Sequence, residues 1–214
     1  MELIFRLNMH EITLAKDTKT VLDLISKQSF HAPFYLSGGT ALALYLGHRE
    51  SEDLDFFTDS DFDPQKLLIE IEKIVKTSGA EISENTLNCY IQGVKVQFLG
   101  YPYKLINQTI SWNNINISSI EDIACTKLLT ISARGSKKDF IDMYFILKNY
   151  SLEILFELLS KKYPKTNYNQ VHILKSLAYF EDANLQPMPR MHMQISWDEI
   201  KKEIVEKLKL FNFT

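Results

Sequence analysis

The stretch SGGTALALYLGHRESEDLDFF, residues 37–57, decides the fold. It opens with two glycines, continues as an apolar run and closes with two aspartates one residue apart, Asp53 and Asp55. Seven carboxylates lie between Glu50 and Asp63, and like charges at this density repel one another unless they are well solvated or something positive binds them. The pattern predicts a strand, a turn at the glycines, a helix and a second strand whose carboxylates bind a cation.

The composition is that of an ordinary globular protein. The chain has 214 residues, of which 45% are hydrophobic and 24% charged, enough for one domain or two small ones. No run is long enough to cross a bilayer and the N-terminus lacks a leader pattern, so we expect a soluble cytoplasmic protein with no membrane partner. Cys89 and Cys125 lack zinc or redox spacing and are expected as buried thiols.

Charge is unevenly distributed along the chain. Residues 1–100 carry 9 Lys and Arg against 15 Asp and Glu, whereas residues 101–214 carry 15 against 12. The acidic first part could hold cations, and the mildly basic second part could meet phosphates.

Local patterns predict strands mostly in the first half and helices in the second. The expected elements are a helix over residues 17–29, strands over 34–38 and 53–58 with a helix over 40–47 between them, a helix from Asp63-Pro64 to Gly79, a hairpin of 86–92 and 94–101, a strand over 115–117, and helices over 119–134, 136–150, 151–162, 168–180 and 196–210. Three capping boxes support the later helices: Ser119 with Asp122, Ser136 with Asp139, and Ser196 with Glu199. We therefore expect an α/β (α+β) fold, with a small mixed-sheet core over residues 1–117 and a helical domain over 118–214.

The two ends of the quoted stretch suggest a site for a metal and a phosphate. Side chains alternate across a strand, so Asp53 and Asp55 share one face. Mg²⁺ or Mn²⁺ takes oxygen ligands, and Mg²⁺ is commonly held by one or two carboxylates together with substrate phosphates. The Gly38-Gly39 turn at a helix N-terminus lets backbone N–H groups approach a phosphate, and Ser37 or Thr40 could add hydroxyl contacts. The simpler alternative is a tight turn followed by a strand with a solvated face.

Two motifs carry a resemblance to a known family. GGTALALYLGHRESEDLDFF resembles the signature of the DNA polymerase β nucleotidyltransferase superfamily, and its wording is similar to the AbiEii/AbiGii type of bacterial nucleotidyltransferase toxin. Downstream, EDIACTKLLTISARGSKKDFIDMYFIL resembles that family's C-terminal motif of a Lys, an Arg and then Lys-Asp followed by Asp. The two motifs frame residues 34–147. The resemblance implies a polymerase β-like nucleotidyltransferase core.

The resemblance also implies roles for matching residues. Gly38 and Gly39 would bind the triphosphate, Asp53 and Asp55 the metal, and Lys127 the nucleotide phosphates. Asp139 would belong to the last motif, with Arg134, Lys137 and Asp142 close by, and Arg49 and His48 could reach phosphate or base. The predicted catalytic residues are Asp53, Asp55, Lys127 and Asp139, and the predicted nucleotide-binding residues are Ser37, Gly38, Gly39, Thr40, Arg49, Lys127, Arg134 and Lys137.

Several of these residues have a structural alternative. Lys127 could be a solvated helical lysine, and Asp139 could serve only its capping box. Asp142 could pair with Lys138, one helical turn away. Arg49 could instead make a surface salt bridge with Glu52 or Asp53.

One position departs from the family pattern. The family places a third carboxylate on a later strand, where this chain has Gln97 in VKVQFLG. Gln offers a neutral oxygen to a metal but cannot accept a proton as a general base. Either metal coordination activates the attacking hydroxyl, or Glu84 or Asp139 substitutes, or catalysis is weakened or lost.

The resemblance implies a metal-dependent nucleotidyltransferase. Such an enzyme transfers a nucleoside monophosphate from a nucleoside triphosphate to an acceptor hydroxyl, here a tRNA 3′ end. It would be the toxin of a toxin–antitoxin or phage-defence pair, with an antitoxin as its protein partner. Two alternatives stay open: transfer to a small molecule, as in antibiotic nucleotidyltransferases, and a degenerate module that binds nucleotides or proteins without turnover.

Overall fold

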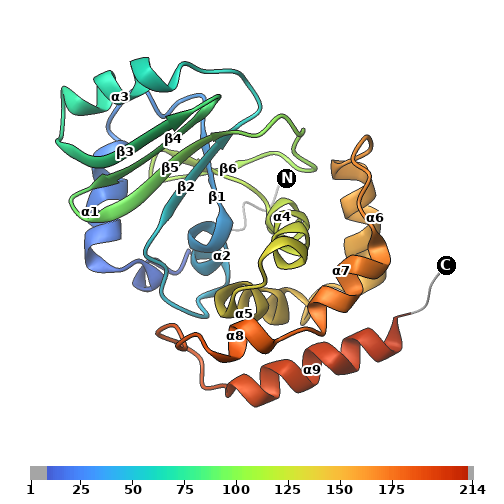
Figure 1. Ribbon diagram of the computed structural model, residues 1–214. Helices are drawn as coiled ribbons and strands as arrows, with labels where there is room; N and C mark the ends of the chain where they lie inside the picture. The colour runs from blue at the N-terminus through green and yellow to red at the C-terminus, as the bar shows by residue number, and fades with distance from the viewer. Residues whose placement is uncertain (1–8, 212–214) are drawn as a thin grey trace, which may run out of the picture.

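The computed structural model describes residues 9–211, and its centre is a seven-stranded mixed sheet (Figure 1). The strands are β1 (Tyr35–Ser37), β2 (Leu54–Thr58), β3 (Thr77–Ser83), β4 (Thr86–Ile91), β5 (Val94–Gly100), β6 (Ile110–Trp112) and β7 (Ile115–Ile117). They stand in the order β3-β4-β5-β2-β1-β7-β6. β1 is parallel to β7 and β2 to β5, while the other neighbours are antiparallel. The expected mixed α/β fold is confirmed.

The stretch 37–57 folds as a strand, a helix and a second strand, as predicted. β1 leads directly into α2 (Gly38–Leu46), which ends at Gly47 in the left-handed conformation (φ 66°). Glycine suits this C-terminal position because it has no Cβ to clash at positive φ. α2 contacts β1, β2 and the later helix α4 (Ile120–Ala133), so most of its residues are buried. The chain then returns in β2, antiparallel to β1.

One face of the sheet is apolar and packs against α1 (Lys16–Ile25) and α3 (Pro64–Glu72) (Figure 1). The residues of β4 and β5 that point into this core are Leu87, Cys89, Ile91, Val94, Val96 and Phe98. Asp63 begins α3 by accepting hydrogen bonds from the backbone N–H groups of Gln65 (3.0 Å) and Lys66 (3.2 Å), as expected of an N-cap before proline. Because side chains alternate across a strand, the polar residues of β4 and β5 lie on the opposite face.

The helix predicted from Asp63 to Gly79 is too long. α3 ends at Glu72, and residues 77–83 form the edge strand β3. Gly79 has a φ of +57° and lies where the pairing of β3 with β4 shifts register. β3 is almost entirely exposed, so it lacks the apolar alternation that marks a half-buried strand. Backbone pairing with β4 therefore defines this strand, and its side-chain pattern does not reveal it.

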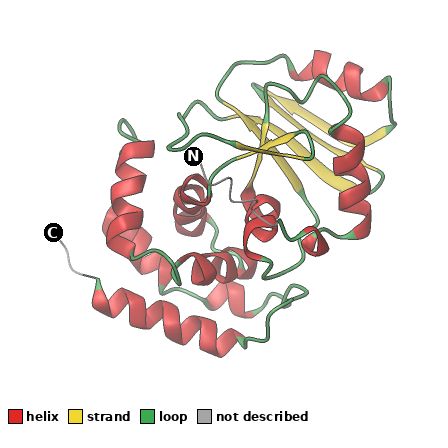
Figure 2. Ribbon diagram, turned by 180° about the vertical axis from the view of Figure 1, so that it is seen from behind, coloured by secondary structure: helices red, strands yellow, loops and turns green. Residues whose placement is uncertain are grey.

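The second half is helical, as predicted, and its helices gather beside the sheet (Figures 1 and 2). After α4 come α5 (Lys137–Ile146), α6 (Leu152–Lys162), α7 (Gln170–Leu177), the short α8 (Glu181–Asn184) and α9 (Trp197–Leu210), and the 3-10 helix η1 (Glu11–Thr13) precedes α1. α5 ends before the expected residue 150, and α8, β3 and β6 have no counterpart among the predicted elements.

The predicted caps are present, with one difference. The hydroxyls of Ser119, Ser136 and Ser196 each accept a hydrogen bond from the backbone N–H three residues later. In α5 and α9 the acidic side chain in turn accepts a hydrogen bond from the backbone N–H of the serine, which completes the capping box. In α4, Asp122 instead accepts from the backbone N–H of Ile106 at 3.0 Å and pairs with Lys162 at 2.6 Å. Asp122 therefore ties the loop after β5 to the helices.

One hydrophobic cluster of the described residues extends through both halves of the chain. It contains Leu36 and Leu42 from the first half together with Ile123 and Leu128 from α4. β7 ends at Ile117 and α4 begins at Ile120, so strands give way to helices near the expected boundary, while the division into two domains there stays a prediction. Within residues 9–211, none of the helices has both the length and the apolar character needed to cross a membrane.

Candidate active site

A row of polar side chains crosses five strands on the sheet face opposite α1 and α3. Asp55 of β2 stands beside Gln97 of β5, and opposite Ser37 of β1. Gln97 in turn stands opposite Asn88 of β4, which is opposite Glu81 of β3. Residues directly paired across strands share a face of the sheet. The register places Gln97 beside Asp55, while its correspondence to a third carboxylate stays a prediction.

The two glycines at the start of α2 make room for two different side chains. Gly38 has a φ of +68°, and a Cβ there would lie 2.5 Å from Oδ2 of Asp55. A Cβ on Gly39 would lie 2.5 Å from Nη2 of Arg49. The Ser37 side chain does not cap α2; its hydroxyl lies 2.9 Å from that of Ser118. The first N–H groups of α2 therefore remain available to an anion, which the helix dipole also favours.

Asp53 and Asp55 carry the charge that a cation could bind. Asp53 is exposed just before β2, and Asp55 is partly exposed within it. Among the described residues, neither carboxylate has a hydrogen bond or an ion pair. Burial and the negative charge of Asp53 raise the pKa of Asp55, which shows that the two carboxylates repel each other. A divalent cation would relieve this repulsion.

The oxygen atoms around the pair fit a hard divalent ion. Gln97 adds a neutral oxygen beside Asp55. Within residues 9–211 no group of three or more His, Cys, Asp or Glu side chains is arranged to hold a metal, so an ion here would take its remaining ligands from water or substrate, as Mg²⁺ commonly does. Glu84, the suggested substitute for Gln97, lies in the turn that precedes Thr86, the first residue of β4. This turn is at the end of the sheet away from Asp53.

A cleft of about 120 Å³ lies between the glycine turn and α4. It is lined by Gly38, Gly39, Asp55, Phe57, Gln97, Ile123, Thr126, Lys127, Thr130, Arg134 and Asp139. The structure thus brings together six of the predicted site residues: the two glycines, Asp55, Lys127, Arg134 and Asp139. Negative groups from the sheet and positive groups from α4 face the same cleft.

Below the cleft, buried charges from three segments form one cluster around Asp142. Its carboxylate accepts from Arg49 through Nε (2.7 Å) and Nη2 (2.9 Å), and from Nε2 of His48 (2.8 Å). Lys127 Nζ lies 2.6 Å from Asp142 Oδ2 and 2.8 Å from Asp139 Oδ1. Two cations therefore meet two carboxylates, and such pairing is what makes burial of charge tolerable. We call these five residues the charge cluster.

The pKa shifts in the charge cluster follow from burial and pairing. Burial alone would raise the pKa of Asp142, but Arg49 and Lys127 hold it well below its usual value. Burial would lower the pKa of Lys127, yet Asp142 and Asp139 raise it. The pKa of His48 is lowered by burial, which outweighs the effect of Asp142. At neutral pH the cluster therefore holds two charged pairs and a neutral imidazole.

Three alternatives considered for these residues are wrong. Arg49 is only 2% exposed and pairs with Asp142, not with Glu52 or Asp53 at the surface. Lys127 is buried, so it is not a solvated lysine. Asp142 does not pair with Lys138, which lies 3.8 Å from Glu52 instead. Asp142 was not among the predicted site residues, although its i, i+3 spacing from Asp139 places both on one helix face.

Other predicted nucleotide contacts have protein partners in this structure. The Thr40 hydroxyl donates to the backbone carbonyl of Asp53 and lies 2.9 Å from Ser51 Oγ, so it braces the segment that carries Asp53. Lys137 Nζ donates to the carbonyl of Gln186 and lies 5.1 Å from the ring centre of Trp197. Lys137 therefore faces α8 and α9 and lies outside the cleft lining. Asp139 both completes its capping box and pairs with Lys127.

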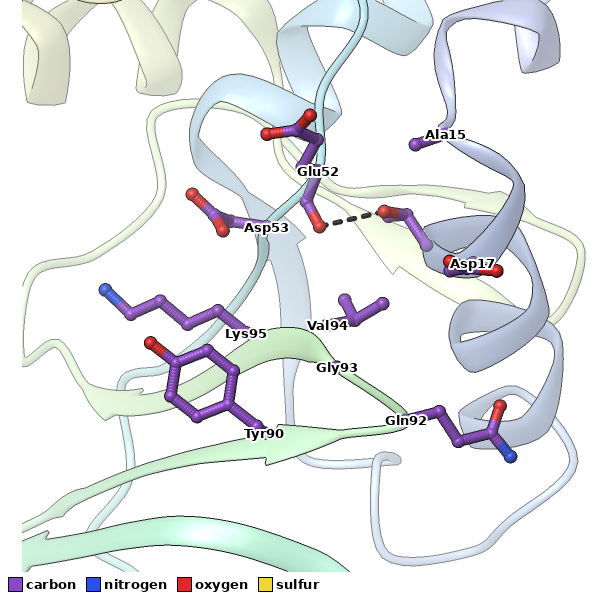
Figure 3. A pocket seen from close by; sticks show the side chains of 10 residues that line it. Ala15, Asp17, Glu52, Asp53, Tyr90, Gln92, Gly93, Val94 and Lys95 are labelled. Carbon is purple, nitrogen blue, oxygen red and sulfur yellow. Dashed lines mark hydrogen bonds between the residues drawn. The ribbon is translucent and has the colours of Figure 1, made fainter.

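A second cavity, of about 350 Å³, opens beside Asp53 (Figure 3). It is lined by Ala15, Asp17, Thr18, Glu52, Asp53, Tyr90, Gln92, Gly93, Val94 and Lys95. The Thr18 hydroxyl donates to the Glu52 carbonyl at 2.8 Å, which joins α1 to the segment before β2. The aspartate pair therefore has a cavity on each side, the glycine cleft at Asp55 and this one at Asp53.

Comparison with known proteins points to one family. The sequence matches the family described as "Nucleotidyl transferase AbiEii toxin, Type IV TA system" over residues 20–108 and 92–213. An uncharacterized protein of Aquifex aeolicus (strain VF5) is 34% identical over 202 residues, covering 92% of this chain and 96% of that protein.

Two solved structures share the fold. A candidate nucleotidyltransferase from H. pylori has a TM-score of 0.55 at 17% identity, over 94% of this chain and 92% of the other. The antibiotic-resistance factor ANT(2'')-Ia has a TM-score of 0.50 at 13% identity, over 67% of this chain and 91% of the other.

Proposed function

Because the chain belongs to the AbiEii nucleotidyltransferase toxin family, we propose that it transfers a nucleoside monophosphate from a nucleoside triphosphate to an acceptor hydroxyl. The observation that carries the proposal is the glycine cleft. In it the uncapped start of α2 and the side chain of Lys127 lie around Asp55, so groups that suit a triphosphate and groups that suit a divalent cation share one space.

The metal site of this proposal is Asp53 and Asp55, with the Gln97 oxygen beside them. Mg²⁺ or Mn²⁺ bound there would offset the negative charge of both the carboxylates and the triphosphate. The raised pKa of Asp55 supports this assignment, as does the lack of a hydrogen bond or ion pair to either carboxylate within residues 9–211.

The protein's own groups would mainly position the substrate and stabilise its charge. The first N–H groups of α2 receive phosphate oxygens, and Lys127 and Arg134 face the same charge from α4. Asp139 and Asp142 keep Lys127 protonated and hold its ammonium in place. The acceptor oxygen then forms a bond to the α-phosphorus while the bond to pyrophosphate breaks. Gln97 cannot take the hydroxyl proton, so that proton leaves to solvent or to a carboxylate.

For the acceptor and the biological role, the family supports a specific proposal. The acceptor is the 3′ end of a tRNA, and the protein acts in the cytoplasm as the toxin of a toxin–antitoxin or phage-defence system, with an antitoxin as partner. The family's description as a type IV toxin–antitoxin component supports the last point.

A small-molecule acceptor is the second candidate. The chain shares its fold with an antibiotic-resistance factor, and Asp17 and Glu52 line the second cavity, where they would attract a cationic compound. A module that binds nucleotides without reacting is the third, because Gln97 replaces a potential base.

A transfer assay distinguishes the three candidates. Purified protein is incubated with each nucleoside triphosphate labelled at the α-phosphate, Mg²⁺, and either bulk tRNA or a cationic antibiotic. We expect label in tRNA with the wild type and with Asp59→Asn, whose carboxylate is exposed after β2, and none with Asp53→Asn/Asp55→Asn. Label only in the antibiotic supports the second candidate, and nucleotide binding without transfer supports the third.

A further inference from the structure

Tyr90 and Lys95 stand directly opposite each other on β4 and β5, at the wall of the second cavity. Figure 3 shows the Tyr90 hydroxyl, the Lys95 ammonium and the Asp53 carboxylate pointing to the same side. Tyr90 is 44% exposed, although β4 lies between β3 and β5 in the sheet. An aromatic face and a cation are thus presented together next to the carboxylate pair.

Both side chains are exposed. Among residues 9–211, Tyr90 and Lys95 make no side-chain hydrogen bond and no ion pair. Gly79 of β3 leaves space for the ring, because a Cβ there would lie 3.2 Å from Tyr90 Cδ2. The shift in register between Ser78 and Glu81 puts this glycine beside the ring. The edge strand β3 therefore leaves room for the Tyr90 ring.

On β5, Lys95 lines the second cavity and Gln97 lines the glycine cleft. Lys95 precedes Gln97 by two residues on the same face, a separation of about 7 Å along the strand, and one nucleotide covers a similar span from its 5′ phosphate to its 3′ hydroxyl. The glycine cleft lies on the other side of the aspartate pair. A transfer between two substrates needs a space on each side of the reacting atoms, and here Asp53 lines the second cavity while Asp55 lines the glycine cleft.

We propose that the second cavity is the acceptor subsite and that it takes the 3′-terminal nucleotide of a single-stranded RNA, whose base stacks on Tyr90 and whose phosphate pairs with Lys95. This inference rests on the proposed function, because it assigns the glycine cleft to the triphosphate. Stacking on an aromatic ring accepts any base, and a lysine gives a phosphate contact without sequence preference. The subsite therefore selects a nucleic-acid end and does not read its sequence.

Binding of acceptor, measured without turnover, tests the subsite directly. The probe is a short single-stranded RNA with a free 3′ hydroxyl and a fluorophore at its 5′ end, followed by anisotropy with Mg²⁺ and a non-hydrolysable nucleoside triphosphate analogue. Tyr90→Ala should weaken binding about tenfold, and Tyr90→Phe should retain it. Lys95→Ala should reduce the slope of log K against log salt by about 0.7, the value for one lost phosphate contact.

Matched controls come from exposed residues elsewhere. Lys73 follows α3, on the far face of the sheet, and Tyr179 follows α7; Lys73→Ala and Tyr179→Ala should leave RNA binding unchanged. Thermal unfolding of each variant checks that it is folded.

The outcomes separate the subsite from the proposed function. RNA binding that depends on Tyr90 and Lys95, without any transfer in the wild type, would support the subsite and refute the transfer. Equal RNA binding by all variants would overturn the subsite even if transfer occurs. A cationic antibiotic that binds the wild type in place of RNA, and binds Lys95→Glu more tightly, would overturn the assigned acceptor class.

Discussion

Asp142 is the residue on which the site depends most. Its carboxylate is fully buried and binds the side chains of Arg49, His48 and Lys127. These residues come from two distant parts of the chain. Without Asp142, Arg49 would lose its carboxylate partner beneath the glycine turn, and Lys127 would keep only Asp139. Asp142 therefore binds Arg49 and Lys127 without itself lining the cleft.

Asp142→Asn should cost about 3–5 kcal/mol of unfolding free energy, because it leaves a buried guanidinium without a counter-charge. Urea denaturation measures the change. Asp182→Asn, at an exposed position of α8, should stay within about 0.5 kcal/mol of the wild type. A loss below 1 kcal/mol for Asp142→Asn would mean that the charge cluster adds little to stability.

Gln97→Glu would place a third carboxylate beside Asp55. We expect the variant to bind Mn²⁺ more tightly and to be less stable than the wild type without metal, since three like charges would then stand close together. Calorimetric titration with Mn²⁺ measures the first effect and thermal unfolding the second. Gln65→Glu, at an exposed position in the first turn of α3, is the control. Unchanged Mn²⁺ affinity in Gln97→Glu would argue against a metal at this position.

Strand alternation and the family motifs identified the aspartates, the glycines and Gln97 from the sequence. The partner of Arg49 could not be identified in this way, because 93 residues separate it from Asp142 and only the packing of α5 against α2 brings them together. The sequence therefore located the charged residues of the cluster without showing which of them pair.

The start of α2 is the element that connects the charge cluster to the cleft. Gly39 packs against the guanidinium of Arg49, which is paired with Asp142. The backbone that would receive a phosphate therefore lies next to this ion pair. Any side chain at Gly39 would push one of the two aside.

Gly39→Ala should destabilise the protein by about 1–3 kcal/mol, as expected for overpacking, and should weaken nucleotide binding. A double-mutant cycle with Arg49→Lys tests the cause. The shorter lysine relieves the contact, so the double variant should lose less stability than the sum of the single changes. Strict additivity would show that Gly39 is required for another reason.

Some secondary-structure elements could be predicted from the sequence and others could not, for physical reasons. The strand, helix and strand of residues 37–57 carry strong apolar patterns and were predicted. β3 is polar and exposed at the edge of the sheet, so no pattern distinguished it from an extension of α3. The missed strand mattered, since β3 supplies the glycine beside Tyr90.

At the scale of the whole molecule, the two halves share a core and a site. The hydrophobic cluster spans both halves, and the glycine cleft takes residues from α2, β2, β5, α4 and α5 or their ends. The sequence suggested separate domains over residues 1–117 and 118–214. Shared packing of this kind favours joint unfolding.

We therefore expect a single unfolding transition in scanning calorimetry, with equal calorimetric and van't Hoff enthalpies. Residues 1–117 expressed alone should not fold, because Arg49 would lack its partner Asp142. The face of α2 that packs on α4 would also be exposed to water. Two resolved transitions, or a folded 1–117 fragment, would support two independent domains instead.

The proposed function requires that Asp53 and Asp55 hold a metal that binds the triphosphate beside the glycine turn. Its most direct test is equilibrium binding of a nucleoside triphosphate to the wild type and to Asp53→Asn/Asp55→Asn, with Mg²⁺ and with a chelator. We expect that the wild type binds the nucleoside triphosphate only with Mg²⁺ and that the double variant loses this binding. Equal binding by both proteins, with or without Mg²⁺, would contradict it.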